Sequence, residues 1–369
     1  MRSIPALSLQ LASCLLVALP ASAAFAANPI NIVQVIDQSG PNGDTGRDFL
    51  TGAHVYFDAL NAHGGINGRH INLVAEDDAG QPQKTVDATR RLVRQYAPAA
   101  LFGYLGTDNV RAILADTALA KLPMVAPYSG VDLPNSSNVF YLRTSLSAEI
   151  GKMAQMAQSI GQTRIGLFIG EDALGRAAQA EVPKHLAGLN AKLTIQSSKA
   201  ESSTDIERAA AKMAESNPQV IILAAPTIAS ADFVRAFQAL RSGTQFLAVS
   251  SINPQTLREF LGDGVRWVGV STVVPSPYNT NSPVVREYVN TLKKYRDEPP
   301  SYASFEGYLS ARLLAENLRK SGDQDGALAR SLDRFDADWG GLALSARKSS
   351  RALRFVDLAI FSDGGKMVH

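Results

Sequence analysis

Residues 30–43 read INIVQVIDQSGPNG, and this stretch decides the fold class. Its first seven residues are an almost continuous run of apolar and β-branched side chains, which predicts a strand that is buried on both faces. The turn at 39–43 leads into a helical pattern that Gly64 and Gly65 end. The core face of this helix comprises Phe49, Ala53, Phe57 and Leu60, which are spaced four, four and three residues apart. A buried strand followed by a helix predicts a parallel sheet that helices cover.

Strand and helix patterns continue to alternate over the next hundred residues. Further strands are predicted at 71–76, 99–104 and 124–126, with helices at 82–96 and from about residue 107. These elements predict one doubly wound lobe.

A similar series starts again after Tyr141-Leu142-Arg143. The predicted strands are 165–169, 192–196, 220–223 and 246–250. Helices are predicted from residue 149, at 176–189 and at 231–241. The residues from Thr204 to Glu207 fit a capping box that would open one more helix. A second lobe of like construction is therefore expected to follow the first.

The chain beyond residue 273 contains too few elements for a third lobe. Helices are predicted at 284–295 and 303–320, and a last strand at 353–361. We expect these pieces to return and cover the first two lobes. The fold class is therefore α/β, with two doubly wound, Rossmann-like lobes joined by a three-strand hinge. The expected bounds are 27–145 plus 275–350 for the N-terminal lobe and 146–274 plus 351–369 for the C-terminal lobe, with crossings near 144–148, 272–276 and 348–353.

The first 26 or so residues are typical of a cleaved export signal. Arg2 is the only charge before Asp37, an apolar stretch covers 9–19, and small residues at 21–26 offer cleavage sites. The mature chain would begin near Ala24 or Ala27, outside the cytoplasm. A membrane anchor is an alternative, but the apolar stretch is shorter than the roughly 20 residues that span a bilayer.

Lipidation of Cys14 is a second alternative, because residues 11–14 read LASC and look like a lipoprotein cleavage box. The residues after Cys14 are still apolar, as the core of a signal would be, which argues against cleavage there. Cys14 is the only cysteine. If it leaves with the signal, the mature chain has no disulfide, no thiolate metal site and no cysteine nucleophile.

Composition narrows the class of partner. The formal net charge of the 369-residue chain is +2, so it carries no electrostatic footprint for nucleic acid. The length exceeds what one core usually serves, and 46% apolar against 19% charged residues leaves ample material for two cores. We therefore expect a soluble exported protein of two domains.

Five motifs recur in the order of a known family. They are Ser39-Gly40-Pro41, the helix end from Asn61 to Arg69, Asp77-Asp78, the segment 103–107 (GYLGT), and 123–130 (PMVAPYSG). In the second lobe, residues 164–169 followed by 172–175 (DALG) match the family's strand and Asp-aromatic-Gly turn, with Leu174 at the aromatic position. The mature chain thus resembles, over essentially its whole length, the type 1 periplasmic binding proteins of the leucine/isoleucine/valine-binding family. These are soluble receptors of ABC importers.

The resemblance implies a ligand between the lobes, at the carboxyl ends of the strands. In the family, the positions that match Thr107, Tyr128 and Gly130 grip the α-carboxylate and part of the ammonium group of the ligand. Here Thr107 offers a hydroxyl at a helix N-terminus that favours an anion, Tyr128 a backbone N–H, and Ser129 a hydroxyl. An alternative for Thr107 is a plain helix cap, and for Ser129 ordinary turn chemistry.

Departures from the family pattern bear on the ligand. Thr45 stands where a large aromatic residue often covers the ligand, Thr227 where Tyr is common, and Ser250 roughly where Glu would bind the ammonium. A buried ammonium without a carboxylate partner is costly. We therefore expect a small carboxylate-bearing or amide-like ligand rather than a plain branched-chain amino acid. The first lobe would grip it through Ser39, Thr107, Tyr128, Ser129 and Gly130, and Thr45, Leu174, Thr227 and Ser250 would cover it.

Other candidate sites have simpler interpretations. Asp77-Asp78 could bind a metal, but we favour a structural role in the loop before Pro82. The five histidines show no metal-ligand spacing and no triad. The loops at 103–106 and 170–175 lack the spacing of nucleotide-binding motifs. We therefore expect no metal and no cofactor.

The expected function is a periplasmic solute receptor that closes on a small molecule and delivers it, as a monomer, to an inner-membrane ABC permease. The alternative is a sensory receptor whose closed form signals to a chemoreceptor or a sensor kinase. An exported α/β enzyme is a further alternative, against which stand the missing thiol, triad and clustered metal ligands.

Overall fold

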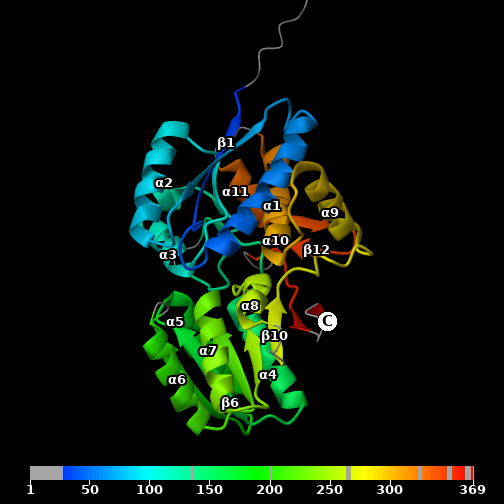
Figure 1. The fold of residues 1–369 in the computed structure, drawn as a ribbon. Helices are drawn as coiled ribbons and strands as arrows, with labels where there is room; N and C mark the ends of the chain where they lie inside the picture. Colours follow the sequence, from blue (N-terminus) through cyan, green and yellow to red (C-terminus); the bar gives the residue numbers. More distant parts are fainter. Residues whose placement is uncertain are drawn as a thin grey trace, which may run out of the picture.

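Two lobes, each a sheet flanked by helices, lie one above the other in the computed structural model (Figure 1). The structure describes residues 28–133, 137–199, 202–262, 267–322, 326–346, 351–361 and 367–368. The predicted signal at 1–26 lies outside these residues. Within the described part of the chain, no helix is long and apolar enough to cross a membrane.

The first sheet has five parallel strands in the order β2-β1-β3-β4-β5. Their bounds are Ile30–Ile36 (β1), Ile71–Asp77 (β2), Ala100–Phe102 (β3), Met124–Val125 (β4) and Val139–Phe140 (β5). All but one residue of β1 are buried, as its continuous apolar pattern predicts. Ile30 pairs with Ile71, and the register runs without a break to the pair of Ile36 and Asp77.

Helices from both ends of the sequence build the first lobe. The early ones are α1 (Gly43–Ala62), α2 (Pro82–Tyr96) and α3 (Thr107–Ala115), followed by a 3₁₀ turn at Leu119–Lys121. The late elements are α9 (Pro283–Tyr295), α10 (Tyr302–Ser321), α11 (Ala327–Asp333) and the hairpin of β11 (Asp336–Asp338) and β12 (Ala343–Ser345). One core cluster joins side chains of β1 and α1 to those of α9, α10 and β12.

The helices α1 and α10 pack backbone against backbone at two glycines. A Cβ on Gly52 would lie 1.7 Å from the carbonyl oxygen of Ser304, and one on Gly307 would lie 2.0 Å from that of Phe49. Both positions therefore exclude any side chain. This close contact fixes the late helix against the helix that opens the first lobe.

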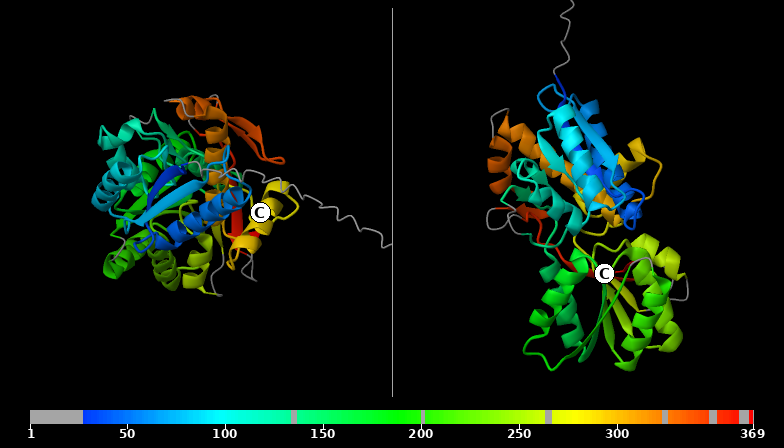
Figure 2. Two further views of the ribbon diagram at one scale, coloured as in Figure 1. Left: turned by 90° about the horizontal axis from the view of Figure 1, so that it is seen from above. Right: turned by 90° about the vertical axis from the view of Figure 1, so that its left-hand side faces the viewer.

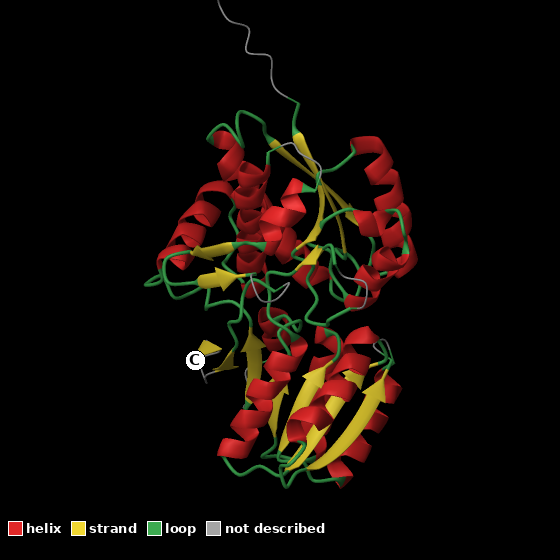
Figure 3. Ribbon diagram, turned by 180° about the vertical axis from the view of Figure 1, so that it is seen from behind, coloured by secondary structure: helices red, strands yellow, loops and turns green. Residues whose placement is uncertain are grey.

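The second sheet has seven strands in the order β14-β13-β10-β9-β8-β6-β7. Its parallel strands are β6 (Arg164–Gly170), β7 (Lys192–Ser198), β8 (Val220–Ala224), β9 (Gln245–Ala248) and β10 (Val268–Thr272). Helices flank its strands, as the secondary-structure colouring shows (Figure 3). They are α4 (Leu146–Ser159), α5 (Ala173–Leu186), α6 (Ser203–Glu215), α7 (Thr227–Leu240) and α8 (Pro254–Leu261).

The edge of the second sheet is antiparallel. The strands β13 (Asp357–Phe361) and β14 (Met367–Val368) continue the sheet beyond β10 with reversed direction. The predicted last strand therefore starts later than residue 353, because Leu353 belongs to the core of the first lobe. The strand β13, drawn in red, lies beside β10 at the edge of the second lobe (Figures 1 and 2).

Two details differ from the sequence-based expectation. The capping box at Thr204 is wrong, because Ser202 caps α6 by accepting a hydrogen bond from the N–H of Asp205 at 3.2 Å. Several short elements were not predicted either, among them β5, α8, β10, α11 and the β11–β12 hairpin, because such short runs give too few positions to establish a period.

Segments that connect the lobes lie next to each other. The N–H of Ala352 donates to Tyr141 at 2.9 Å, and that of Leu353 donates to Leu142 at 2.8 Å. Another connection follows β10, where Thr272 ends a strand of the second sheet and Val274 joins the core of the first lobe. The domain bounds stated above stay a prediction.

Three carboxylates shape the loops that follow β1 and β2. Oxygens of Asp37, Asp77 and Asp78 lie within 4.8 Å of one another, and each carboxylate accepts hydrogen bonds from the protein. Asp37 accepts from the N–H groups of Gly40 and Asn42, at 2.6 and 2.9 Å. Asp77 accepts from Gln38, Ser39 and Ala79. This geometry agrees with the structural role that we favour for Asp77 and Asp78.

Asp78 is the buried member of this group. It accepts from Thr85 Oγ1 at 2.7 Å, from the N–H of Gly80 at 2.8 Å and from Asn109 Nδ2 at 3.1 Å. Burial raises the pKa of Asp78 from 3.8 to about 6, and the neighbouring negative charges of Asp37 and Asp77 add to the rise against these hydrogen bonds.

Gly307→Ala is expected to destabilise the fold by about 1–3 kcal/mol or more, because its methyl group would overlap the backbone of α1. Urea unfolding, followed by circular dichroism, measures this. The control is Gly151→Ala on α4, whose methyl group would meet the ring of His185 at 3.1 Å and no backbone of a neighbouring helix. Equal stability of the two variants would contradict the proposed role of the α1–α10 contact.

Asp78→Asn is expected to gain stability relative to the natural protein as pH rises from 4 to 6. The folded state raises the pKa of Asp78, so it binds this proton more tightly than the unfolded state does. The natural protein therefore loses stability across this window, by about 3 kcal/mol at most, whereas asparagine does not titrate. Urea unfolding at pH 4, 5, 6 and 7 measures the difference, with the exposed Asp87→Asn as control. If the difference in the free energy of unfolding between Asp78→Asn and the natural protein stays constant over this pH range, the raised pKa of Asp78 is wrong.

Candidate functional site

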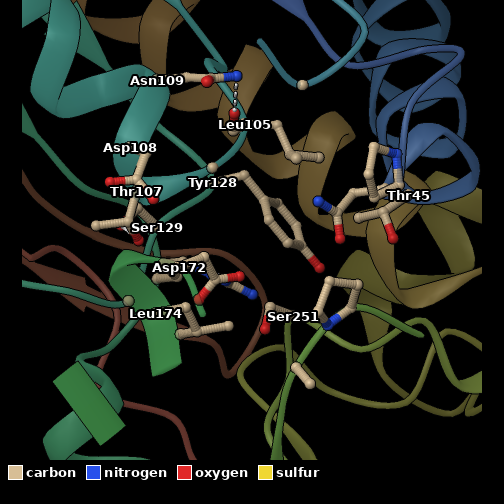
Figure 4. Close-up of a pocket in the computed structure, with 18 residues that line it drawn as sticks. Thr45, Leu105, Thr107, Asp108, Asn109, Tyr128, Ser129, Asp172, Leu174 and Ser251 are labelled. Atoms are coloured by element: carbon tan, nitrogen blue, oxygen red, sulfur yellow. Dashed lines mark hydrogen bonds between the residues drawn. The ribbon is translucent and has the colours of Figure 1, made fainter. Parts of the chain in front are cut away.

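A cavity of about 230 Å³ lies between the two lobes (Figure 4). The first lobe lines it with the starts of α1 and α3 and with the loop after β4, including Thr45, Thr107 and Ser129. The second lobe contributes the starts of α5 and α7, including Leu174 and Pro226. These segments follow the carboxyl ends of parallel strands, where ligands bind in open α/β sheets.

Thr107 and Ser129 place two hydroxyl groups side by side on the first-lobe wall. Their Oγ atoms lie 3.0 Å apart, and both residues are buried. Ser129 Oγ also accepts a hydrogen bond from the N–H of Val131 at 3.3 Å. The alternative of Thr107 as a plain cap is wrong, because Gly106 occupies the cap position and Thr107 is the first helical residue. Its hydroxyl is therefore available to the cavity wall.

The N-termini of three helices lie at this cavity, and no side chain caps them. The cap residues of α1, α3 and α7 are Asn42, Gly106 and Pro226, and none of them caps its helix through a side chain. All three line the cavity. Uncapped N–H groups and the positive end of the helix dipole attract anions, by roughly 0.3–2 kcal/mol for each helix. These three N-termini favour a group with negative charge, whereas the carboxylates of Asp108 and Asp172, which also line the cavity, oppose one.

The helix α5 differs, because carboxylates occupy its N-terminus. Asp172 caps it by accepting from the N–H of Gly175 at 2.7 Å, and Asp108 of the first lobe accepts from the N–H of Ala173 at 2.8 Å. Burial raises the pKa of Asp172, and the nearby negative charge of Asp108 adds to the rise. Neither Asp108 nor Asp172 was predicted as a site residue, since Asp108 was placed at the start of a helix and Asp172 in a turn.

Tyr128 contributes its ring rather than its backbone. We expected its N–H to face the ligand, but this is wrong, because it donates to the carbonyl of Tyr104 at 2.7 Å. The hydroxyl of Tyr128 donates to the carbonyl of Ser250, in the second lobe, at 3.2 Å. Burial raises the pKa of this hydroxyl, so it stays protonated. The ring leans into the cavity in Figure 4.

A buried arginine also lines the cavity. Arg143 is 1% exposed, and the centre of its guanidinium lies 3.9 Å from the centroid of the Tyr128 ring. Its Nε and Nη2 donate to Glu306 of α10 at 2.9 and 3.2 Å, and Nη2 donates to Ser250 Oγ at 3.1 Å. Burial by itself would lower the pKa of Arg143, but Glu306, Tyr128 and Glu149 together outweigh burial and raise it. The guanidinium is therefore charged.

Glu149 completes this buried network from the second lobe. Its two carboxylate oxygens accept from the N–H and the hydroxyl of Ser250, at 2.8 and 2.9 Å. Burial raises the pKa of Glu306, which the charge of Arg143 opposes. The network thus connects the crossing segment at Arg143 to both lobes.

Six of the nine sequence-predicted residues line the cavity: Thr45, Thr107, Tyr128, Ser129, Gly130 and Leu174. Three do not line it, and the hydroxyl of each has a partner in the protein. Ser39 donates to Asp77 at 2.5 Å in an exposed loop, and Thr227 accepts from the N–H of Asn253 at 3.1 Å. Ser250 is bonded to Glu149 and Arg143. Instead the next residue, Ser251, lines the cavity, and its buried hydroxyl has no hydrogen-bond partner among the described residues.

Comparison with known proteins gives one consistent family. The family model described as "Periplasmic binding protein" matches residues 29–341. The Leu/Ile/Val-binding protein of Escherichia coli (strain K12) is 22% identical over 319 residues, which cover 85% of each chain.

Solved structures agree in fold. A substrate-binding periplasmic protein from Ralstonia solanacearum superimposes with a TM-score of 0.85 and 33% identity, over 92% of this chain and 99% of that one. A branched-chain amino acid transporter substrate binding protein from Streptococcus pneumoniae, solved with isoleucine, gives a TM-score of 0.82 at 16% identity, over 92% and 98% of the two chains. The chain therefore belongs to the periplasmic binding proteins, as a type 1 member of the leucine/isoleucine/valine-binding family.

Proposed function

We propose that this protein is the periplasmic receptor of an ABC importer, and that it closes its two lobes on a small ligand with a carboxylate or an amide group. The observation that carries the proposal is the convergence of three uncapped helix N-termini and the hydroxyls of Thr107 and Ser129 on one cavity. Backbone N–H groups and hydroxyls are the donors that a carboxylate or an amide oxygen accepts from.

The size and the walls of the cavity limit the rest of the ligand. Its 230 Å³ lies below the roughly 300–1,000 Å³ of pockets for drug-sized ligands, which suits a small metabolite. Leu105 and Tyr128 in the first lobe and Leu174 and Pro226 in the second give it apolar surfaces. A short apolar body with one polar end therefore fits better than a sugar-like molecule with polar groups all round.

Charge in the site also argues against a free ammonium group on the ligand. In the described residues, Glu306 pairs with Arg143 and both carboxylate oxygens of Glu149 accept from Ser250, and neither glutamate lines the cavity. Asp108 and Asp172 accept from the start of α5. This supports a carboxylic acid or an amide over a plain branched-chain amino acid, because a buried ammonium needs a carboxylate partner.

Relatives support the role in transport. The names of the matched proteins describe binding proteins, and several of these names refer to ABC transporters or amino acid transporters. In this proposal the ligand is bound and released unchanged, and the permease recognises the closed form.

The double variant Thr107→Val with Ser129→Ala is expected to weaken binding of the best ligand by about tenfold or more, because it removes both hydroxyls from the wall. Native mass spectrometry identifies a ligand that survives purification. Titration calorimetry against amino acids, aliphatic amides and aromatic acids then measures its affinity.

The matched control is Thr291→Val, which removes a hydroxyl from the exposed side of α9, where it donates to the carbonyl of Glu287. Its affinity should equal that of the natural protein. Tight binding of leucine would contradict the proposed selectivity. Unaltered affinity in the double variant would contradict the proposed site, and normal solute uptake by a deletion strain would contradict the role in import.

A further inference from the structure

Asp108, the second residue of α3, reaches from the first lobe to the start of α5 in the second. Its Oδ2 accepts a hydrogen bond from the N–H of Ala173 at 2.8 Å, and its Oδ1 lies 3.3 Å from Nη2 of Arg176. On its own helix the same carboxylate pairs with Arg111 at 2.9 Å. One side chain of the first lobe therefore contacts two groups of the second.

Asp108 completes the cap of a helix that belongs to the other lobe. The first N–H groups of a helix have no partner inside the helix and form its positive end. In α5, Asp172 takes the N–H groups of Gly175 and Leu174, and Asp108 takes that of Ala173. If Asp108 moves away, the N–H of Ala173 loses its acceptor.

This contact lies far from the segments that cross between the lobes, so an opening of the lobes affects it strongly. The helices α3 and α5 face each other on the left in Figure 1, whereas the chain crosses between the lobes after β10 on the right. When one lobe rotates against the other about the crossing segments, the groups farthest from these segments move apart most. Among the other contacts between the lobes, that of Arg143 with Ser250 starts from a residue of a crossing segment and can persist in part, whereas those of Tyr128 with Ser250 and of Asn253 with Asp48 join residues outside these segments. The bond from Ala173 to Asp108 must break when the lobes open.

We propose that Asp108 is a latch that sets the closing equilibrium of the two lobes. This inference rests on the proposed function, in which closure traps the ligand. Asp108 acts as a positioning residue. It raises the fraction of molecules with closed lobes, and this raises the apparent affinity for every ligand that binds the closed form. The hydrogen bond to a charged acceptor accounts for about a tenfold change in that population.

The distance between the lobes tests the latch without any ligand. Exposed Lys84 on α2 and Lys212 on α6 are replaced by cysteine and carry spin labels, since the mature chain is expected to have no thiol of its own. Double electron–electron resonance then gives the distribution of distances between the labels. In Asp108→Ala we expect this distribution to move to longer distances and to broaden. Asp108→Asn should lie between, because its amide oxygen can still accept from Ala173 but attracts Arg176 less.

The matched control is Asp232→Ala on α7. Asp232 pairs with Arg235 three residues on, as Asp108 pairs with Arg111, and both aspartate side chains are 35% exposed. Its distance distribution should equal that of the natural protein. An unchanged distribution in Asp108→Ala, with native near-ultraviolet circular dichroism, would overturn the latch, and so would an equal shift in Asp232→Ala. Failure to find a ligand would instead count against the proposed function, because no ligand enters this measurement.

Discussion

The ion pair of Arg143 and Glu306 is the interaction on which the site depends. Arg143 follows the last strand of the first sheet, and Glu306 comes from α10, 163 residues later. Both are nearly fully buried, so the loss of either partner would leave an uncompensated charge at a cost of about 3–5 kcal/mol. Through Ser250 the pair also contacts the second lobe, and through Tyr128 it supports the cavity wall. The ion pair and its contacts form only when both lobes and α10 are in place.

A second arginine secures the same region from the C-terminal side. Arg351 donates to the backbone carbonyls of Gly130, Arg143 and Thr144, and its Nη2 lies 2.7 Å from Asp132. The loop that carries Ser129 and Gly130 is thereby attached to a crossing segment of the hinge. We therefore expect a movement of this segment to displace the hydroxyls on the cavity wall, which would couple the position of the lobes to the shape of the cavity.

Sequence patterns predict those parts of the fold and site that local chemistry determines. The continuous apolar run of β1 and the spacing of Phe49 and Phe57 predict a buried strand and its covering helix, and Thr107 follows from its place after a strand. Arg143 could not be predicted as a site residue, because its partners lie 107 and 163 residues away. For the same reason Ser250 was placed in the ligand site, although Glu149, 101 residues earlier, already occupies its hydroxyl. Such long-range pairs leave no periodic signal.

The contact of α10 with α1 has a consequence for the order in which the lobes fold. The core of the first lobe joins side chains between residues 30 and 142 to others between 274 and 353, whereas the core of the second consists of residues 146–270. Domains fold as units once their residues are present. As the chain emerges from its N-terminus, the second lobe can complete its core from one uninterrupted segment, while the first must wait for α10. The lobe that begins the sequence therefore completes its core later than the second lobe does, although the edge strands β13 and β14 join the second sheet only at the end of the chain.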